Sequence, residues 1–385
     1  MYNFDFCNPT KIIFGKDRLD ELDDVIPKEA KVLVTYGGGS VKKFGTLDKV
    51  LAGLKERKVV EFSGIEPNPR FDTLMKAVEV VKAENIDFLL AVGGGSVMDG
   101  TKFISLAASY EGDALDLLRD RTATRKITKA IPLGTVCTLP ATGSEMNSGG
   151  VITSKVGKRG FGSPLVFPKF SFLDPTLTYT LPETQVANGI VDTYVHVLEQ
   201  YVTYPAEGRF QDRAAEGILL TLIEIGRKTI DNPTDYDLRA NLVWCATMGL
   251  NGLIGAGVPQ DWAVHMIGHE LTAMFGIDHG KTLAVILPSL WNVMRESKGE
   301  KLLQYGERVF GITEGSKEER IDLAIDKTRE FFESLGIKTR LGDYGVKKES
   351  IDDLVKALEE HNMTAIGEKG EITLEVSRKI LEGAF

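Results

Sequence analysis

The chain has 385 residues, of which 43% are hydrophobic and 26% are charged, and its net charge is −9. This is the composition of a globular protein with one large domain or two ordinary ones. An acidic surface repels nucleic acids and anionic membranes, so we expect neither as a partner. The opening residues lack the basic start and apolar core of a signal peptide. Cys7, Cys137 and Cys245 have no CxxC spacing and favour reduced, structural thiols in a cytoplasmic protein.

The first half of the chain alternates strand and helix patterns. Apolar, β-branched runs end in glycines or small residues, and segments with helical spacing separate them. This order predicts an α/β fold of the Rossmann type, with a parallel sheet that helices cover on its faces. Strands are predicted within 11–15, 31–40, 59–62, 86–96 and 130–145, and helices over 71–85 and 97–110.

Strand-like runs nearly vanish after residues 173–185. The apolar spacing beyond that stretch is helical, which predicts an all-helical second domain. The prolines within 174–184 mark the boundary, so we expect an α/β domain over 1–183 and a helical domain over 184–385, with a ligand cleft between them. Helices are predicted over 186–203, 213–230, 238–254, 324–335, 350–361 and 373–384.

Two GGGS turns follow predicted strands, one at 37–40 and one at 93–96. Where a helix follows such a turn, backbone N–H groups and the helix dipole hold a phosphate close to the chain. The alternative for either turn alone is a tight connection, because glycine is the default turn residue. Their recurrence at two strand ends favours a dinucleotide site. The predicted cofactor contacts are Gly37, Gly38, Gly39, Ser40, Gly93, Gly94, Gly95 and Ser96.

The first turn indicates which dinucleotide to expect. Folds that bind NAD usually place an acid at the end of the strand that meets the adenosine ribose, whereas NADP needs small or basic groups for its extra phosphate. The strand before this turn ends without an acid, and Ser40 is followed by Lys42 and Lys43. This favours NADP(H) with Lys43 as a contact, although the two lysines can equally be the solvated start of a helix.

Further cofactor candidates lie after the second turn and in the loop TLPATGSE. Asp99 and Lys102 fall on the first turns of the following helix and can meet ribose or phosphate. Asp99 near a helix N-terminus is also stabilising through the dipole alone. Thr138 and Thr142 belong to a small-residue loop that can run along a dinucleotide or be a simple connection.

Four of the five histidines gather in two segments of the second half. Asp192 and His196 are four residues apart in VDTYVHVLEQ, and His265 and His269 repeat this spacing in DWAVHMIGHE. On a helix, such a spacing places both side chains on one face. His279 follows in a glycine-flanked loop. Three imidazoles and one carboxylate suit Zn²⁺ or Fe²⁺, but spacing alone does not decide which three histidines bind.

Joined in this order, GGGSVMDGTK, TLPATGSE, DPTLTYTLP, NGIVDTYVHVLEQ and HMIGHELTAMFGIDHG resemble the iron-containing (group III) alcohol dehydrogenases. The resemblance covers nearly the whole chain and is strongest to the butanol dehydrogenase branch with its NADPH-dependent aldehyde reductases. It implies a dinucleotide-binding domain followed by a helical metal-binding domain, in a fold shared with dehydroquinate synthase, and a homodimer. The metal ligands that it implies are Asp192, His196, His265 and His279.

The resemblance also implies roles for residues near these ligands. His269 matches a family histidine that is not a ligand, and it is a candidate for proton transfer. Lys158, in SKVGKRGF, matches a family lysine near the cofactor. Residues beside the cofactor loop and the ligand segments are expected to line the substrate pocket, and these are Leu139, Asn147, Leu253 and Trp262.

We therefore expect reversible hydride transfer between NADP(H) and a small aldehyde or alcohol, with Fe²⁺ or Zn²⁺ polarising the carbonyl group. Two alternatives stay open: a metal- and NAD-dependent lyase of the dehydroquinate synthase type, and a metal hydrolase in which the glycine turns are structural. Such a lyase needs basic residues for a phosphate and carboxylate substrate. The histidine-bearing segments VDTYVHVLEQ and DWAVHMIGHE contain no Lys or Arg.

Overall fold

The computed structural model describes residues 1–120 and 122–385. Two compact units make up this part of the chain. The sheet unit consists of Cys7–Leu181 and Pro233–Thr247, and the helical unit consists of Met1–Phe6, Pro182–Asn232 and Met248–Phe385. This division differs from a single boundary after residue 183 in where it places residues 1–6 and 233–247.

Long-range contacts explain the placement of these two segments. Val243 packs in a core cluster of the sheet unit, and the Thr247 hydroxyl donates a 2.6 Å hydrogen bond to Glu145. In the helical unit, the Tyr2 N–H donates to the carbonyl of Gly257. Partners so far apart in the sequence leave no local pattern, so a reading of periodicity does not find them.

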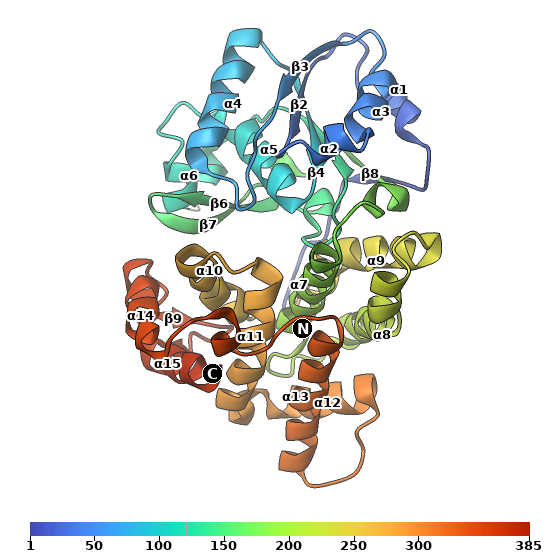
Figure 1. The fold of residues 1–385 in the computed structure, drawn as a ribbon. Helices are drawn as coiled ribbons and strands as arrows, with labels where there is room; N and C mark the ends of the chain where they lie inside the picture. Colours follow the sequence, from blue (N-terminus) through green and yellow to red (C-terminus); the bar gives the residue numbers. More distant parts are fainter. Residues whose placement is uncertain (121) are drawn as a thin grey trace. The chain divides into compact units, whose positions relative to one another are not determined.

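Six parallel strands, counted within the described residues, form the main sheet in the order β1-β8-β5-β4-β2-β3. This confirms the predicted parallel α/β fold (Figure 1). A separate antiparallel hairpin, β6 (Gly149–Ser154) and β7 (Gly157–Gly162), was not predicted. The strands of the main sheet are β1 (Lys11–Phe14), β2 (Lys31–Tyr36), β3 (Lys58–Phe62), β4 (Phe88–Gly93), β5 (Leu133–Cys137) and β8 (Phe170–Leu173).

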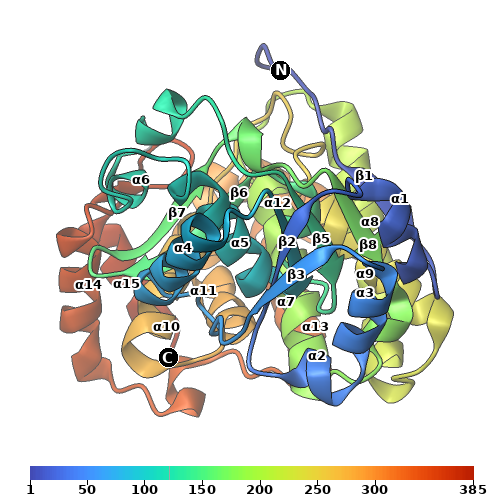
Figure 2. The ribbon, with the colours of Figure 1, turned by 90° about the horizontal axis from the view of Figure 1, so that it is seen from above.

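Helices cover both faces of this sheet (Figure 2). Side chains alternate between the faces along each strand: on β2, Leu33 joins one core cluster, whereas Val32 and Val34 join the other. The first cluster includes apolar residues of α4 and α5, and the second includes those of α1 and α3. The helices of this unit are α1 (Leu22–Val25), α2 (Ser40–Lys43), α3 (Thr46–Gly53), α4 (Phe71–Glu84), α5 (Gly95–Ala107) and α6 (Asp116–Arg119), and most of α9 (Tyr236–Gly249) also belongs here.

The helical unit is organised around α7 (Glu183–Tyr201), whose residues from Gly189 to Tyr201 are all buried. In Figure 1, α10 and α11 lie beside it, and α7 packs against α11 and α8. None of the helices in the described residues is both long and apolar enough to cross a membrane. The remaining elements of this unit are α8 (Arg209–Asp231), α10 (Ala263–Phe275), α11 (His279–Val293), α12 (Arg295–Phe310), α13 (Lys317–Ser334), α14 (Ile351–Glu360), β9 (Ala365–Ile366), β10 (Ile372–Thr373) and α15 (Leu374–Gly383).

Candidate functional site

Helix α7 carries three ionisable side chains on one face. Asp192, His196 and Glu199 are separated by four and then three residues, and residues at these spacings are neighbours on an α-helix. All three are buried. Because a buried charge is costly without a partner, their surroundings decide what they can do, and α10 and α11 provide those surroundings.

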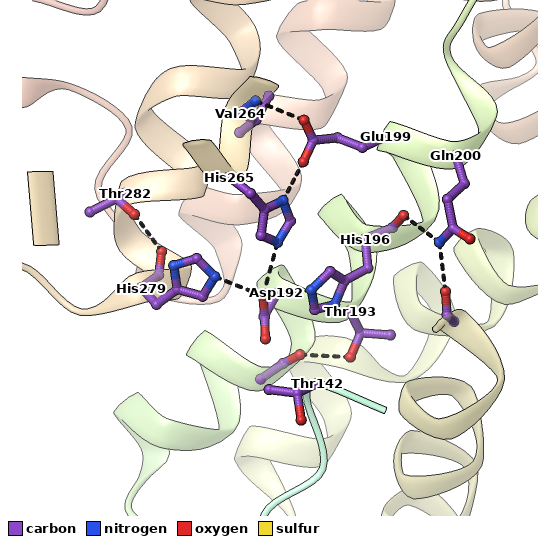
Figure 3. A network of polar contacts seen from close by, with 12 residues as sticks. Thr142, Asp192, Thr193, His196, Glu199, Gln200, Val264, His265, His279 and Thr282 are labelled. Atoms are coloured by element: carbon purple, nitrogen blue, oxygen red, sulfur yellow. Dashed lines mark hydrogen bonds and ion pairs between the residues drawn. The ribbon is translucent and has the colours of Figure 1, made fainter. Parts of the chain in front are cut away.

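Three imidazoles converge on one oxygen of Asp192 (Figure 3). Asp192 Oδ1 lies 3.5 Å from His196 Nε2 and 3.6 Å from His265 Nε2. The same oxygen lies 3.5 Å from His279 Nε2. These separations are long for hydrogen bonds. They are close to the distance of about 3.4 Å that separates two ligand atoms placed tetrahedrally at roughly 2.1 Å from one metal ion.

The hydrogen bonding of this cluster supports the same interpretation. Asp192 Oδ1 and His265 Nε2 are both buried and lack a hydrogen-bond partner within the described residues. The donor atoms of Asp192, His265 and His279 all lie within 4.8 Å of one another, and His196 adds a fourth donor at its distance from Asp192. Buried polar atoms without partners are rare and costly. A divalent cation would satisfy both of these atoms, so the residues present fit a metal.

Electrostatics also favour a cation at this point. Burial alone would raise the pKa of Asp192, but His196, His265 and His279 outweigh it and hold this pKa well below its usual range. Burial would lower the pKa of His265, yet the carboxylates of Glu199 and Asp192 on either side of its ring raise it to about 9. Without a metal, the His265 ring between these two carboxylates thus holds a positive charge.

Glu199 holds the far side of the His265 ring, and the sequence reasoning did not identify it. Its Oε2 contacts His265 Nδ1, and its Oε1 accepts a 2.7 Å hydrogen bond from the Val264 N–H (Figure 3). The signal was available, because Glu199 lies seven residues after Asp192, two turns along the same helix face.

His279 was expected in a loop, but it is the first residue of α11. Gly276 takes the left-handed conformation (φ 66°) that ends α10, as a turn there requires. Gly280 serves a different purpose, because a Cβ at this position would lie 2.6 Å from the backbone oxygen of Asn188 on α7. The glycine lets α11 approach α7 closely, which brings His279 to Asp192.

The rings of His269 and Trp262 lie close to those of the cluster histidines. The ring centre of half-buried His269 is 5.1 Å from that of His279 and 6.4 Å from that of His265. The Trp262 ring lies 5.4 Å from that of His265, and its backbone is left-handed (φ 69°) at the start of α10. Leu253 is half-buried in the segment that precedes α10.

In the sheet unit, three predicted loops share one edge. They follow β2, β4 and β5, which are neighbouring parallel strands, and the carboxyl ends of such strands form the usual ligand edge of an open α/β sheet. The Thr138 N–H donates to the Gly93 carbonyl. A Cβ on Gly95 would lie 2.5 Å from the Thr142 side chain, and one on Gly94 would lie 3.0 Å from Cβ of Leu139. The second GGGS turn therefore packs closely against the loop after β5.

The first GGGS turn lies at the surface, and an acidic side chain from a neighbouring strand lies beside it. Gly39 has a φ of 108°, which favours glycine, and α2 begins at the exposed Ser40. The end of β2 itself has no acid, but Glu61 of the adjacent β3 lies beside the turn. Glu61 Oε2 is 3.2 Å from Lys42 Nζ and accepts a 2.7 Å hydrogen bond from the Tyr36 hydroxyl. Lys43 is exposed.

Asp99 and Lys102 tie α5 to the loop after β5. Lys102 Nζ is buried and donates to Ser144 Oγ and Asn147 Oδ1, each at 2.8 Å, and to the Gly149 carbonyl at 2.9 Å. Asp99 accepts from Ser144 Oγ at 2.6 Å and from the Val151 N–H at 2.9 Å. Through these hydrogen bonds, Lys102, Asp99 and Asn147 stabilise the conformation of the loop after β5. The predicted ribose, phosphate and substrate contacts of these residues stay predictions.

Lys158 lies on β7, and its Nζ donates a 2.9 Å hydrogen bond to Asn68 Oδ1. The Asn68 N–H lies 3.3 Å from Ser96 Oγ of the second GGGS turn. A basic side chain from the hairpin thus connects through Asn68 to this turn. The sequence alone did not indicate the link, because it depends on the unpredicted hairpin.

Comparison with known proteins adds independent findings. Residues 9–175 match the family model of the iron-containing alcohol dehydrogenases, and residues 186–378 match the model of the C-terminal part of the Fe-containing alcohol dehydrogenase family. The chain is 58% identical to the NADPH-dependent aldehyde reductase YqhD of Escherichia coli over 100% of both chains. A crystal structure of YqhD superposes with a TM-score of 0.97, covering 100% of this chain and 99% of that one. NADH-dependent butanol dehydrogenase A from Thermotoga maritima, at 36% identity and the same coverage, gives a TM-score of 0.94.

Proposed function

Because the chain belongs to the iron-containing alcohol dehydrogenase family, we propose that it catalyses the NADPH-dependent reduction of aldehydes to primary alcohols. The observation that carries this proposal is the convergence of three imidazoles on the buried carboxylate of Asp192. The identity of 58% with an NADPH-dependent aldehyde reductase over the full chain supports the same reaction.

The proposed metal ligands are Asp192, His196, His265 and His279. Three imidazoles and a carboxylate suit Fe²⁺ and Zn²⁺, and we propose one of these two as the resident metal. A divalent cation held there supplies a Lewis acid that polarises a carbonyl group. Asp192 contributes the negative charge of the set, Glu199 contacts the His265 ring, and the packing of α7 with α11 and of α10 with α11 brings the ligand-bearing helices together.

The proposed NADPH contacts are the two GGGS turns, with Thr138 and Thr142 after β5 and Lys158 on the hairpin. The N-terminus of the thirteen-residue helix α5 begins at Gly95, and its free N–H groups suit a pyrophosphate. Exposed Ser40 and Lys43 at the first turn suit the extra phosphate of NADPH. Because the Thermotoga relative is named for NADH, the preference for NADPH depends on this turn rather than on family membership.

We propose that His269 returns the proton at the end of the reaction. It is half-buried, and its ring centre lies 5.1 Å from that of His279. Leu139, Leu253 and Trp262, with Asn147 at the loop after β5, are proposed to line the substrate site. Their largely apolar side chains favour aliphatic aldehydes over polyols.

The lyase and hydrolase alternatives receive less support. The family models that match both halves of the chain describe alcohol dehydrogenases. A hydrolase would also leave the two glycine turns and the loop after β5 without a ligand. Neither alternative has an observation of its own in its favour.

We further propose a homodimer in a reducing, cytoplasmic setting. Tyr2, Phe4 and Phe6 lie on the first residues of the chain, and each is roughly half exposed; together with exposed Phe210 they offer apolar area for a second copy. All three cysteines are free thiols. Burial raises the pKa of the Cys245 thiol to about 12, which makes a structural role more suitable than a reactive one.

The test is an assay of aldehyde reduction with defined metal content. Purified protein is treated with a chelator, divided, and reconstituted with Fe²⁺, Zn²⁺ or buffer, and the oxidation of NADPH or NADH is followed after addition of butanal. We expect the buffer sample to be inactive, one metal to restore activity, and NADPH to be preferred. Full activity without metal would overturn the proposed mechanism, and a clear preference for NADH would overturn the role given to the first turn.

A further inference from the structure

One buried carboxylate of the helical unit, that of Glu199, is neither a proposed metal ligand nor the proposed proton donor. Glu199 has a side chain that is only 2% exposed, and it lies on α7 with two of the proposed ligands. Both of its oxygens are engaged at the start of α10: Oε2 contacts His265 Nδ1, and Oε1 accepts a 2.7 Å hydrogen bond from the Val264 N–H. This arrangement determines which ring nitrogen of His265 carries the proton.

The two tautomers of a neutral imidazole differ in which nitrogen can bind a metal. A neutral histidine carries one N–H and one lone pair on its two ring nitrogens, and only the lone pair can bind a metal. A carboxylate that faces Nδ1 stabilises the form with the proton on Nδ1, because an ionised carboxylate can only accept. The lone pair then lies on Nε2, which is the atom 3.6 Å from Asp192 Oδ1.

We propose that Glu199 is a positioning residue that fixes the Nδ1–H tautomer of His265 and thereby sets the affinity of the site for its metal. The inference rests on the proposed function only for the identity of the metal site. Partners of this kind behind a metal-binding histidine typically contribute 10- to 100-fold in metal affinity.

The backbone that presents His265 is anchored separately. The Asp261 N–H donates a 2.8 Å hydrogen bond to the Glu199 carbonyl, and Asp261 Oδ1 accepts from the Ala263 N–H at 3.1 Å. Buried Lys298 lies 2.7 Å from Asp261 Oδ2 and 2.9 Å from a carboxylate oxygen of Glu368. These contacts do not involve the Glu199 side chain, so a change of that side chain leaves them in place.

The substitution Glu199→Gln separates orientation from packing. A glutamine has nearly the same shape but presents one acceptor and one donor. If its oxygen accepts from Val264, its NH₂ group faces Nδ1 and drives the ring proton to Nε2, where it blocks the metal. If its oxygen faces Nδ1, its NH₂ group opposes the Val264 N–H. The first orientation keeps the bond from Val264 and reverses the hydrogen bond at Nδ1, whereas the second places two donors face to face. We therefore expect the first orientation.

The matched control is Glu216→Gln, which changes another buried glutamate of the helical unit. Glu216 accepts from the Tyr201 hydroxyl at 2.8 Å and pairs with Arg308 at 2.9 Å. Within the described residues, its hydrogen bonds and ion pairs do not reach any of the proposed ligands. Both changes remove one buried carboxylate charge. A general effect of that loss would therefore be the same in both variants.

The experiment measures Zn²⁺ affinity by competition with a chelator in the metal-free full-length protein and in both variants. Nitrogen NMR of the histidine rings, which distinguishes Nδ1–H from Nε2–H, is recorded without metal at a pH above the pKa of His265, where this ring is neutral. We expect Glu199→Gln to bind Zn²⁺ 10- to 100-fold more weakly and to lose the Nδ1–H form of His265. Glu216→Gln is expected to match the wild type in both measurements.

Unchanged affinity or an unchanged tautomer in Glu199→Gln would overturn the proposal, as would an equal loss of affinity in Glu216→Gln. These results are distinct from a failure of the proposed function. If wild-type protein bound no Zn²⁺ or Fe²⁺ tightly, the metal site itself would be wrong. If wild-type protein bound metal tightly and Glu199→Gln bound it equally well, only the role of Glu199 would be lost.

Discussion

The candidate metal site is formed by side-chain atoms, whereas the candidate cofactor site is formed largely by backbone. In the helical unit, the candidate site consists of buried side chains, and the donor atoms of Asp192 and three histidines define it. In the sheet unit, the candidate cofactor edge consists largely of backbone, and glycines define it through the side chains that they lack. One site depends on which atoms are present, and the other depends on the space that is left free.

This difference predicts how each region fails. A site of side-chain donors fails when one atom changes its chemistry, even if the shape is kept. A backbone site is insensitive to such changes elsewhere but fails when a single methyl group enters it. A substitution that changes a donor atom in the helical unit should therefore lower metal binding. A substitution that adds volume at a glycine of the sheet unit should instead weaken cofactor binding.

The largest effect is expected from Asp192→Asn. The change keeps the size of the side chain but removes the negative charge on which three imidazoles converge. We expect the metal to be lost on gel filtration and aldehyde reduction to fall by more than about 100-fold, beyond the range of indirect partners. Metal analysis and the NADPH assay measure both.

The control for this prediction is Asp212→Asn, which changes an aspartate of the same unit that pairs with Lys301 at 2.6 Å. This variant should keep its metal. If Asp192→Asn retained full metal content and activity, the side-chain site in the comparison would be wrong.

A smaller effect is expected from Gly95→Ala in the sheet unit. The added Cβ would lie 2.5 Å from the Thr142 side chain, so the second turn or the loop after β5 must move. Overpacking of this kind costs about 1–3 kcal/mol. We expect the KM for NADPH to rise roughly tenfold, which is the equivalent of about 1.4 kcal/mol, while the metal content stays unchanged.

Gly217→Ala is the matched control for that change. A Cβ at Gly217 of α8 meets no atom within 4 Å, so alanine should leave the KM for NADPH unaltered, and its helix propensity should slightly stabilise the protein. Loss of metal in Gly95→Ala with an unchanged KM would contradict the division between the two regions.

The sequence predicts the features whose signal is local. Strand–glycine–helix order leads to β2, β4 and the parallel sheet, and the spacing of Asp192 and His196 places both on one helix face. Features that depend on distant partners were missed. Strand β8 is a four-residue run at Phe170–Leu173 whose neighbours β1 and β5 are known only from the fold. Helix α11 is buried almost all round and so lacks the polar face that marks a surface helix.

The same distinction applies within the sites. The rarity and regular spacing of histidine gathered Asp192 and four histidines as candidates, and the family resemblance set His269 apart from the ligands. Glu61 reaches the first turn only because β3 pairs with β2, and Asn68 meets Lys158 only because an unpredicted hairpin exists. The sequence of one segment does not show a charged residue that a neighbouring strand places beside it.

The smallest effect concerns Lys102, the buried cation that supports the loop after β5. Burial lowers its pKa from 10.5 to about 8, although Asp99 and Glu145 oppose this shift. Between pH 8 and 10.5 the unfolded chain therefore binds a proton that the folded protein does not, so the stability from this residue rises with pH. We expect the free energy of unfolding of the wild type to gain about 1 kcal/mol between pH 7 and 9 relative to Lys102→Met, as measured by urea denaturation. Parallel pH profiles of the two proteins would show that Lys102 keeps its ordinary pKa, and the loop would then be held by a fully charged ammonium group.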